Sequence, residues 1–264
     1  MTIIKRAVRN AVDRRAAAFA LLAVVAVFSL GARCIERTSV HVDSDGYTHI
    51  TGEMVNDTDV QGTRVMLRGT LYDGAGNVLA TKDAPTCPPD TQPQQQTAFD
   101  IRFDNPNIPP HASFEVRPVS AITLTEQLPS PDVVLFFTDA ARFEDVPPIP
   151  GLGITDSDVL LTFNGRNRSG VTYEGVQGCS AVYDNQGNVI HVQSTELIQI
   201  DGAGNPSPAT MNSAGPYTAF LIAEGVPKGP VQVRAWLWFG PKGAPTSQYQ
   251  FVATPMITIQ TIKF

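Results

Sequence analysis

The chain has 264 residues, of which 42% are hydrophobic and 17% are charged, and it carries a formal net charge of −6. This balance excludes an intrinsically disordered chain, because enough apolar side chains are present to build a core. With 21 proline and 21 glycine residues interrupting short apolar runs, the composition favours turn-rich, all-β domains. The length suits two domains of ordinary size.

The N-terminal part resembles an export segment. A basic head precedes an uncharged stretch of 17 residues, AAAFALLAVVAVFSLGA, at positions 16–32. As a helix it would be about 25 Å long, slightly shorter than a hydrocarbon core of about 30 Å. Two interpretations stay open for residues 1–37: a retained signal-anchor helix in the membrane, or a cleaved signal peptide. Both predict an extracytoplasmic body, either anchored in the cell membrane or secreted.

Charge is divided unevenly along the chain. Residues 1–32 hold five basic side chains against Asp13, a net charge of +4, which leaves −10 for the rest of the total of −6. Phosphate binding requires clustered cations, and no basic cluster follows residue 32. Nucleic acid is therefore excluded as a partner.

The first strands, at 39–42 and 47–56, are expected to form a hairpin around Asp45-Gly46. In that register His41 faces Ile50 and His49 faces Val42, so the two imidazoles do not meet. The histidines are also scattered, and no zinc site is predicted. They are His41, His49, His111 and His191.

Acidic triplets occur at Asp43-Ser44-Asp45 and Asp156-Ser157-Asp158. Calcium is the alternative that they leave open, because acidic loops outside the cell can hold it. Calcium takes six or more oxygen ligands, whereas each triplet supplies two or three carboxylates at most. We therefore interpret them as turn-forming residues and predict no metal and no cofactor.

A hairpin sequence that occurs twice organises the chain. Val65–Leu79, VMLRGTLYDGAGNVL, returns 111 residues later as Val176–Ile190, VQGCSAVYDNQGNVI. Each copy places Tyr-Asp before a turn that contains glycine and continues with Asn-Val. The aspartate can accept hydrogen bonds from its own turn, and the glycine can adopt a positive φ.

Further segments recur in the same order. The matched pairs are 56–59 with 167–170, 97–103 with 218–223, 113–119 with 230–239, and 130–135 with 254–259. Two of these segments, Asn56-Asp57-Thr58 and Asn167-Arg168-Ser169, also fit the N-glycosylation pattern. Their equivalent positions favour a turn shared by both copies.

The repeats predict an all-β protein with two tandem immunoglobulin-like β-sandwiches preceded by one N-terminal hydrophobic helix. The predicted segments are 1–37 for the signal-anchor or signal peptide, 38–138 for the first sandwich, 139–152 for a Pro-rich linker, and 153–264 for the second sandwich. The linker contains VPPIPG at 146–151, which favours an extended, stiff conformation.

The duplicated hairpin resembles the FxLYD family of small β-sandwich domains on exported and envelope proteins of bacteria and archaea. The motif residues are Leu71-Tyr72-Asp73 with Gly76-Asn77-Val78, and Val182-Tyr183-Asp184 with Gly187-Asn188-Val189. An earlier part of the resemblance is carried by 52–58 and by Gly165, Asn167 and Ser169. The sequence departs from the family at the Phe position, which is Gly69 in one copy and Ser180 in the other. The resemblance implies an extracytoplasmic module without known catalysis, and no binding residues.

Three cysteines, Cys34, Cys87 and Cys179, make an odd count for an exported protein. Lipidation of Cys34 is disfavoured, because Arg33 stands where a lipobox has a small residue. Strand alternation points Cys179 away from its own core. A Cys87–Cys179 bridge would join the two domains; free or intermolecular thiols are the alternative.

An aromatic run is the one feature that is typical of a binding site. In PVQVRAWLWF at 230–239, alternation places Arg234, Trp236 and Trp238 on the outward face. These three residues are the candidate contacts for a sugar ring or a protein partner. The alternative is that the linker or the C-terminal strand covers them, because an exposed pair of tryptophans is costly.

No catalytic motif is present: the sequence lacks Gly-x-Ser-x-Gly, a phosphate-binding loop and His-Glu-x-x-His. We therefore predict no catalytic residues and no enzyme. The expected function is a non-catalytic extracytoplasmic protein that presents two β-sandwiches for structural or protein–protein roles. The expected partners are the membrane, through the N-terminal helix, and a protein. The alternative is a carbohydrate-binding envelope protein that uses the outward aromatic patch.

Overall fold

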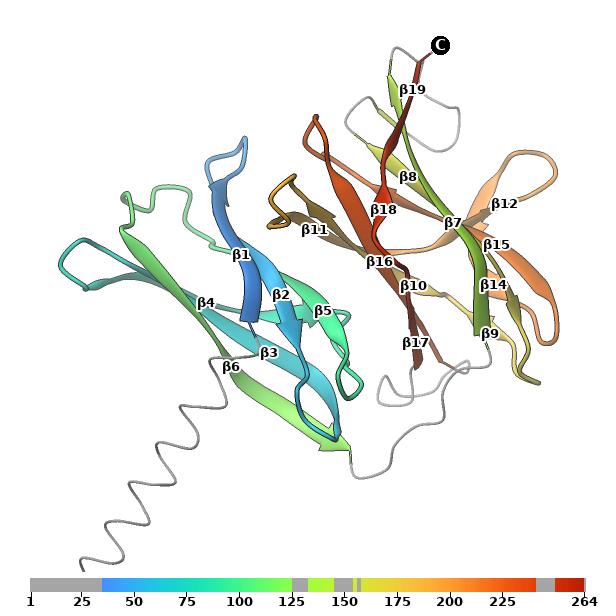
Figure 1. Ribbon diagram of the computed structural model, residues 1–264, viewed down its shortest axis with the longest axis horizontal. Coiled ribbons are helices and arrows are strands. Elements are labelled where there is room, and N and C mark those ends of the chain that lie inside the picture. The colour runs from blue at the N-terminus through green and yellow to red at the C-terminus, as the bar shows by residue number, and fades with distance from the viewer. Residues whose placement is uncertain (1–34, 125–132, 145–153, 156–157, 241–249, 264) are drawn as a thin grey trace, which may run out of the picture.

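The computed structural model describes residues 35–124, 133–144, 154–155, 158–240 and 250–263. These residues form β-strands and loops, with no helix among them, and the strands gather in two units, coloured blue to green and green to red in Figure 1. The predicted all-β class is confirmed. The predicted N-terminal helix, Cys34 and residues 145–152 of the predicted linker lie outside the described residues.

The first unit contains six strands. They are β1 (Ile35–Val42), β2 (Thr48–Val55), β3 (Gln61–Tyr72), β4 (Val78–Cys87), β5 (Gln96–Arg102) and β6 (Ser113–Leu124), paired in the order β1-β2-β5-β4-β3-β6. Most of β4 pairs with β3, while its end, Thr86 and Cys87, pairs with β5. One strand thus joins the two layers, which close over a core that includes Leu67, Phe99 and Ile101.

The second unit has two larger sheets. One contains β7 (Val133–Glu144), β8 (Val159–Asn167), β12 (Ile198–Ile200), β13 (Pro206–Pro208), β15 (Pro216–Ala223) and β19 (Gln260–Lys263), in the order β13-β12-β15-β8-β7-β19. The other contains β10 (Gln177–Tyr183), β11 (Val189–Glu196), β16 (Gln232–Phe239) and β17 (Gln250–Ala253), in the order β11-β10-β16-β17, with β18 (Ile257–Thr258) also on β16. β9 (Tyr173–Glu174) and β14 (Thr210–Met211) form a small ribbon.

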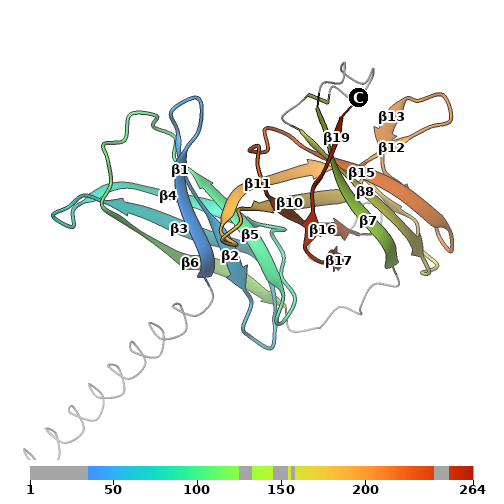
Figure 2. The same ribbon diagram turned by 45° about the horizontal axis from the view of Figure 1, so that its top comes forward.

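The two units share their pairing pattern. β1-β2-β5 of the first unit corresponds to β7-β8-β15 of the second, and β4-β3-β6 corresponds to β11-β10-β16. Figure 2 shows both units from a second direction. Each has its own buried core, which contains Phe99 in the first unit and Phe163 in the second.

The predicted hairpin turns are confirmed. Asp73 donates its N–H to the carbonyl of Asn77 (2.9 Å), and Asp184 does the same toward Asn188 (3.0 Å). The glycines at these turns adopt φ of +83° at Gly76 and +84° at Gly187. Each aspartate also accepts backbone N–H groups on its side chain, so the sequence closes these turns locally.

The Asn-x-Ser/Thr segments form the same turn in both copies. Asn56 donates from Nδ2 to the carbonyl of Val60 (2.9 Å), and Asn167 donates to those of Val171 (2.7 Å) and Met211 (3.0 Å). Both asparagines are buried. Each buried amide therefore bonds a carbonyl of its own turn and holds that turn closed.

We expect Asn167→Ala to lower the free energy of unfolding of the second unit by about 1–3 kcal/mol, because the bonds from the buried amide to the carbonyls of Val171 and Met211 are lost. Urea denaturation followed by circular dichroism measures this loss. The matched control is Asn205→Ala, since Asn205 is exposed and its side chain bonds only its own turn, at Asp201. Equal losses in the two variants would contradict the structural role of Asn167.

The predicted domain boundary differs from the structure. β7 pairs with β8 along its length and with β19, so residues 133–144 belong to the second unit. The prediction placed 133–138 in the first sandwich and 139–144 in the linker. Likewise the match of 130–135 with 254–259 does not hold, because β7 occupies the position of β1, whereas β18 lies on β16. An apolar strand carries no signal of which sheet it will join.

The register of the first hairpin also differs from the prediction. His41 lies directly opposite His49, and Val42 opposite Thr48. Asp43 closes a longer turn with two bonds to Tyr47: its N–H donates to the Tyr47 carbonyl (2.9 Å), and its side chain accepts the Tyr47 N–H (2.8 Å). The pairing therefore shifts by one residue relative to a two-residue Asp-Gly turn, and it brings the imidazoles together.

Candidate functional site

The candidate site is the seam between the two sandwiches, where a third apolar cluster lies apart from both cores. Its buried members are Cys87, Ala98, Cys179, Ala181, Tyr183, Val189, Trp236 and Trp238. The first two come from β4 and β5 of the first sandwich, and the others from β10, β11 and β16 of the second. The outward faces of two sheets therefore bury each other.

A disulfide crosses this seam. Cys87, at the end of β4, is bonded to Cys179 on β10, with a Cα–Cα distance of 5.9 Å and a sequence separation of 92. Of the two alternatives left by the sequence, the structure contains the bridge. Strand alternation correctly placed Cys179 on the face opposite its own core, and the first sandwich buries it there.

The aromatic pair lies inside the seam. Trp236 is 0% exposed and Trp238 is 7% exposed, while Val233, Ala235 and Leu237 point into the core of the second sandwich. The predicted parity of β16 is thus correct. The first sandwich and Met256 cover the indoles. The surface on which the carbohydrate-binding alternative depended is therefore absent from this arrangement.

Arg234 on β16 contacts residues of both sandwiches. Its guanidinium lies 5.5 Å from the ring centre of Trp236, and its Nε donates to the carbonyl of Thr254 at 3.2 Å. Its Nη1 donates across the seam to the side-chain carbonyl of Gln96 on β5. The three predicted contact residues therefore come together, but as part of the contact between the two sandwiches.

A buried carboxylate forms the polar centre of the seam. Glu53 on β2 is 0% exposed and accepts hydrogen bonds from the hydroxyl of Tyr183 at 2.5 Å and from Nε2 of Gln96 at 2.6 Å. Nε of Arg37 lies 3.4 Å from the same carboxylate. Burial raises the pKa of Glu53, and burial beside Glu53 raises the pKa of Tyr183. The Tyr183 hydroxyl therefore keeps its proton at neutral pH and donates it to Glu53.

The edge strand β11 lies against the outward face of β1 and β2. The carbonyl of Val189 accepts hydrogen bonds from the hydroxyls of Thr51 (2.6 Å) and Ser39. These bonds join residues 138 and 150 positions apart in the chain. Together with the disulfide and the Glu53 network, they fix the seam at several points.

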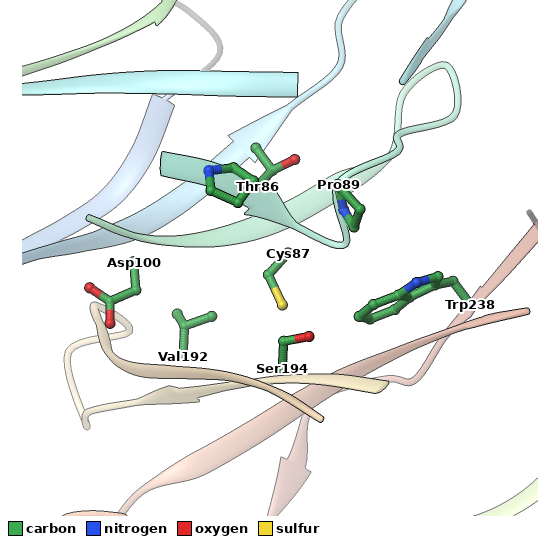
Figure 3. A pocket seen from close by; sticks show the side chains of 8 residues that line it. Thr86, Cys87, Pro89, Asp100, Val192, Ser194 and Trp238 are labelled. Atoms are coloured by element: carbon green, nitrogen blue, oxygen red, sulfur yellow. The ribbon is translucent and has the colours of Figure 1, made fainter. Parts of the chain in front are cut away.

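A pocket of about 310 Å³ opens beside the disulfide (Figure 3). Its walls are mainly apolar, and its lining comprises Pro85, Thr86, Cys87, Pro89, Asp100, Val192, Ser194 and Trp238. In Figure 3, Asp100 and Trp238 lie on opposite sides of Cys87. Glycoside hydrolysis ordinarily needs a pair of carboxyl groups, and this pocket supplies only Asp100. Asp100 is moreover hydrogen-bonded to His49 (2.8 Å).

The predicted metal candidates are occupied by structural bonds. Asp43 accepts backbone N–H groups of its turn and a bond from His49, and Asp158 accepts bonds from Thr155 and Gly225. Asp156 lies outside the described residues. Within the described ranges, no group of three or more His, Cys, Asp or Glu side chains is placed to hold a metal ion.

Sequence reasoning missed the polar face of β2. His49, Thr51 and Glu53 occupy alternate positions along this strand, for which the sequence predicted no role, and all three are buried. The sequence does carry a signal for a buried polar face. Neighbouring outward positions hold a glutamate, a histidine, a threonine and a serine, which can form a hydrogen-bonded network. Which surface would cover them could not be read from alternation.

The comparisons with known proteins add little. No family model matches the sequence, and no curated protein is similar to it. A calcium-binding mutant of Bacteroides uniformis beta-glucuronidase 2 aligns with 84% of this chain and 28% of its own length, at 9% identity and a TM-score of 0.23. This chain thus spans less than a third of that protein, and so low a score supports no statement about shared fold or activity.

Proposed function

We propose that this chain is a non-catalytic, extracytoplasmic protein that presents two tandem immunoglobulin-like β-sandwiches of the FxLYD type as one rigid structural or protein-binding module. The single observation that carries the proposal is the disulfide between Cys87 and Cys179. Disulfides persist in oxidising environments outside the cytoplasm and are rare within it. The basic and apolar N-terminal segment supports the same location.

Rigidity follows from how the seam is built. Apolar contacts, the covalent bridge and the bonds of Glu53, Thr51 and Arg234 all act between the same two bodies. Flexible tandem domains usually share small and polar interfaces, and this one includes two buried tryptophans. A module of this kind holds its two ends at a fixed separation, which suits a spacer or a scaffold.

The proposal includes attachment to the membrane. β1 begins at Ile35, and the uncharged stretch ends at residue 32. If the stretch is retained, the first sandwich lies directly at the membrane surface and the second extends beyond it. Among the described residues no helix is long and apolar enough to cross a bilayer. A protein partner is proposed rather than a sugar, because the aromatic pair is buried.

We expect the full chain, expressed in a bacterial host, to fractionate with membranes or to be exported. Protease added outside intact spheroplasts should digest the body, and a thiol-reactive mass tag should label Cys87 and Cys179 only after reduction. Intact-mass measurement then distinguishes a retained anchor from a cleaved signal. An intact chain in the cytosol with both thiols free would refute the proposal.

A further inference from the structure

Three histidines meet at one end of the seam. His41 on β1 and His49 on β2 are stacked, with ring centres 5.1 Å apart and an interplanar angle of 11°. His191 lies on β11 of the second sandwich, two residues after Val189, whose carbonyl binds Thr51 and Ser39, and it interacts electrostatically with His41 and His49. The cluster therefore has members on both sandwiches.

His49 is held as a cation by its two hydrogen bonds. Its Nδ1 lies 2.8 Å from Asp100, and its Nε2 lies 3.1 Å from Asp43. Ionised carboxylates only accept hydrogen bonds, so both ring nitrogens must carry a proton. In agreement, the carboxylates of Asp100 and Asp43 raise the pKa of His49.

The other two imidazoles are in the opposite situation. Nδ1 of His41 and Nε2 of His191 are buried and have no hydrogen-bond partner, while a side-chain hydrogen bond with Gln193 partly offsets the effect of burial on the pKa of His191. A proton added at either atom would create a buried cation with no acceptor, close to the cationic ring of His49. Both residues are therefore neutral while the seam is closed.

The charges around the three histidines balance only while His41 and His191 are neutral. From the first turn and β5, Asp43 and Asp100 face His49, and Arg102 lies 3.7 Å from Asp43. β1 and β2 also bring Arg37 and Glu53, which bind each other, and β11 brings His191 itself. From β16, Arg234 binds Gln96. Two carboxylates thus face two cations, and further protons would leave excess positive charge.

We propose that His41, His49 and His191 form a proton-operated latch: acidification charges His41 and His191 and opens the seam between the sandwiches, which the disulfide keeps tethered. This device is independent of where the protein resides. Opening would expose the face that carries Trp236 and Trp238, so acid would convert a closed scaffold into one with an accessible aromatic surface.

The sign of the effect follows from the titration of each group. Burial lowers the pKa of His41 and of His191 from the usual value of about 6.5, so the open state binds protons more readily. Their stabilisation of the closed seam is complete above about pH 6.5 and is lost as the pH falls below it. The partners of His49, Asp43 and Asp100, belong to its own sandwich, so opening the seam leaves both of its hydrogen bonds in place. Glu53, with a raised pKa, acts in the opposite direction at lower pH.

The chain provides its own reporter for this latch. It contains two tryptophans, Trp236 and Trp238, and both lie in the seam. For the full chain in non-ionic detergent, acrylamide quenching of tryptophan fluorescence should increase at least about twofold between about pH 7.5 and pH 5.5, because histidines titrate in this range. Far-UV circular dichroism should stay constant, since both sandwich cores remain folded.

Variants separate the latch from general acid effects. The His41→Gln, His191→Gln double variant should show no increase, whereas the control His111→Gln should behave like the wild type. His191→Lys should show the acid level of quenching already at about pH 7.5, because its charge is permanent over this range. A wild type without the increase, a double variant that keeps it, or a His191→Lys variant that stays closed would each overturn the proposal. Should the double variant fail to fold, the wild-type titration and His191→Lys decide.

Discussion

Replacing Trp236 with alanine is expected to lower the free energy of unfolding by about 3–5 kcal/mol, the usual cost of removing a large, fully buried aromatic side chain. Trp236 is 0% exposed and packs in the cluster that both sandwiches share. The loss should therefore include the coupling between the sandwiches, and the single unfolding transition should separate into two. Urea denaturation monitored by circular dichroism and by calorimetry measures both effects.

The internal duplication supplies a matched control. Trp236 lies opposite Cys179 in the second sandwich, and Arg117 lies opposite Arg68 at the equivalent place in the first. Arg117 is exposed, so Arg117→Ala should cost no more than about 1 kcal/mol, as for a surface charge. A loss for Trp236→Ala as small as this one would contradict its role in the seam.

Removing the disulfide in the Cys87→Ala, Cys179→Ala variant is expected to cost about 2–5 kcal/mol, in line with the loss of other native bridges. The bridge joins residues 92 positions apart and ties the end of β4 to β10 beside the pocket. Without it, the seam relies on noncovalent bonds alone. Denaturation midpoints of the variant and of the wild type, with and without reductant, measure this contribution.

The third cysteine provides the control for this experiment. Cys34→Ala removes a thiol while leaving the bridge in place, so its midpoint should equal that of the wild type, and reductant should lower both alike. The double variant should in turn be insensitive to reductant. A double variant as stable as the wild type would show that the bridge adds nothing to the seam.

The burial of the aromatic pair changes how this chain is understood. An outward tryptophan pair is typical of a ligand surface, but here it serves the contact between two copies of the same fold. The first sandwich has no such pair, because its β6 carries Arg117 at the equivalent position and stays exposed. The two copies have therefore diverged on this face: the second sandwich buries it in the seam, whereas the first leaves it exposed to solvent.

Much of the local structure was predictable from the sequence. The turns at Asp73 and Asp184 depend on side-chain bonds to neighbouring backbone and on a glycine with positive φ. The parity of β16, and the outward direction of Cys179, follow from the period of two along a strand. The shared turn at Asn56 and Asn167 was likewise expected from its equivalent position in both copies.

The sequence-based prediction was wrong about the register of the first hairpin and about the sandwich to which β7 belongs. A shift of one position in the first hairpin decided whether His41 meets His49, and the sequence favoured the shorter turn. Asp43 tips the balance toward the longer turn through bonds to Asp45 and Tyr47. The strand β7 was assigned to the wrong sandwich, because its apolar residues would fit either sheet.

By itself, the sequence determined the all-β class, the duplication and the faces of its strands, since turns and alternation depend on residues that are neighbours in the chain. Only the tertiary structure decided that the outward faces of β2 and β16 cover each other, that Cys87 bonds Cys179, and that His191 joins His41 and His49. The physical reason is that alternation separates a strand's inner face from its outer face. It does not say whether water or a second domain lies beyond the outer one.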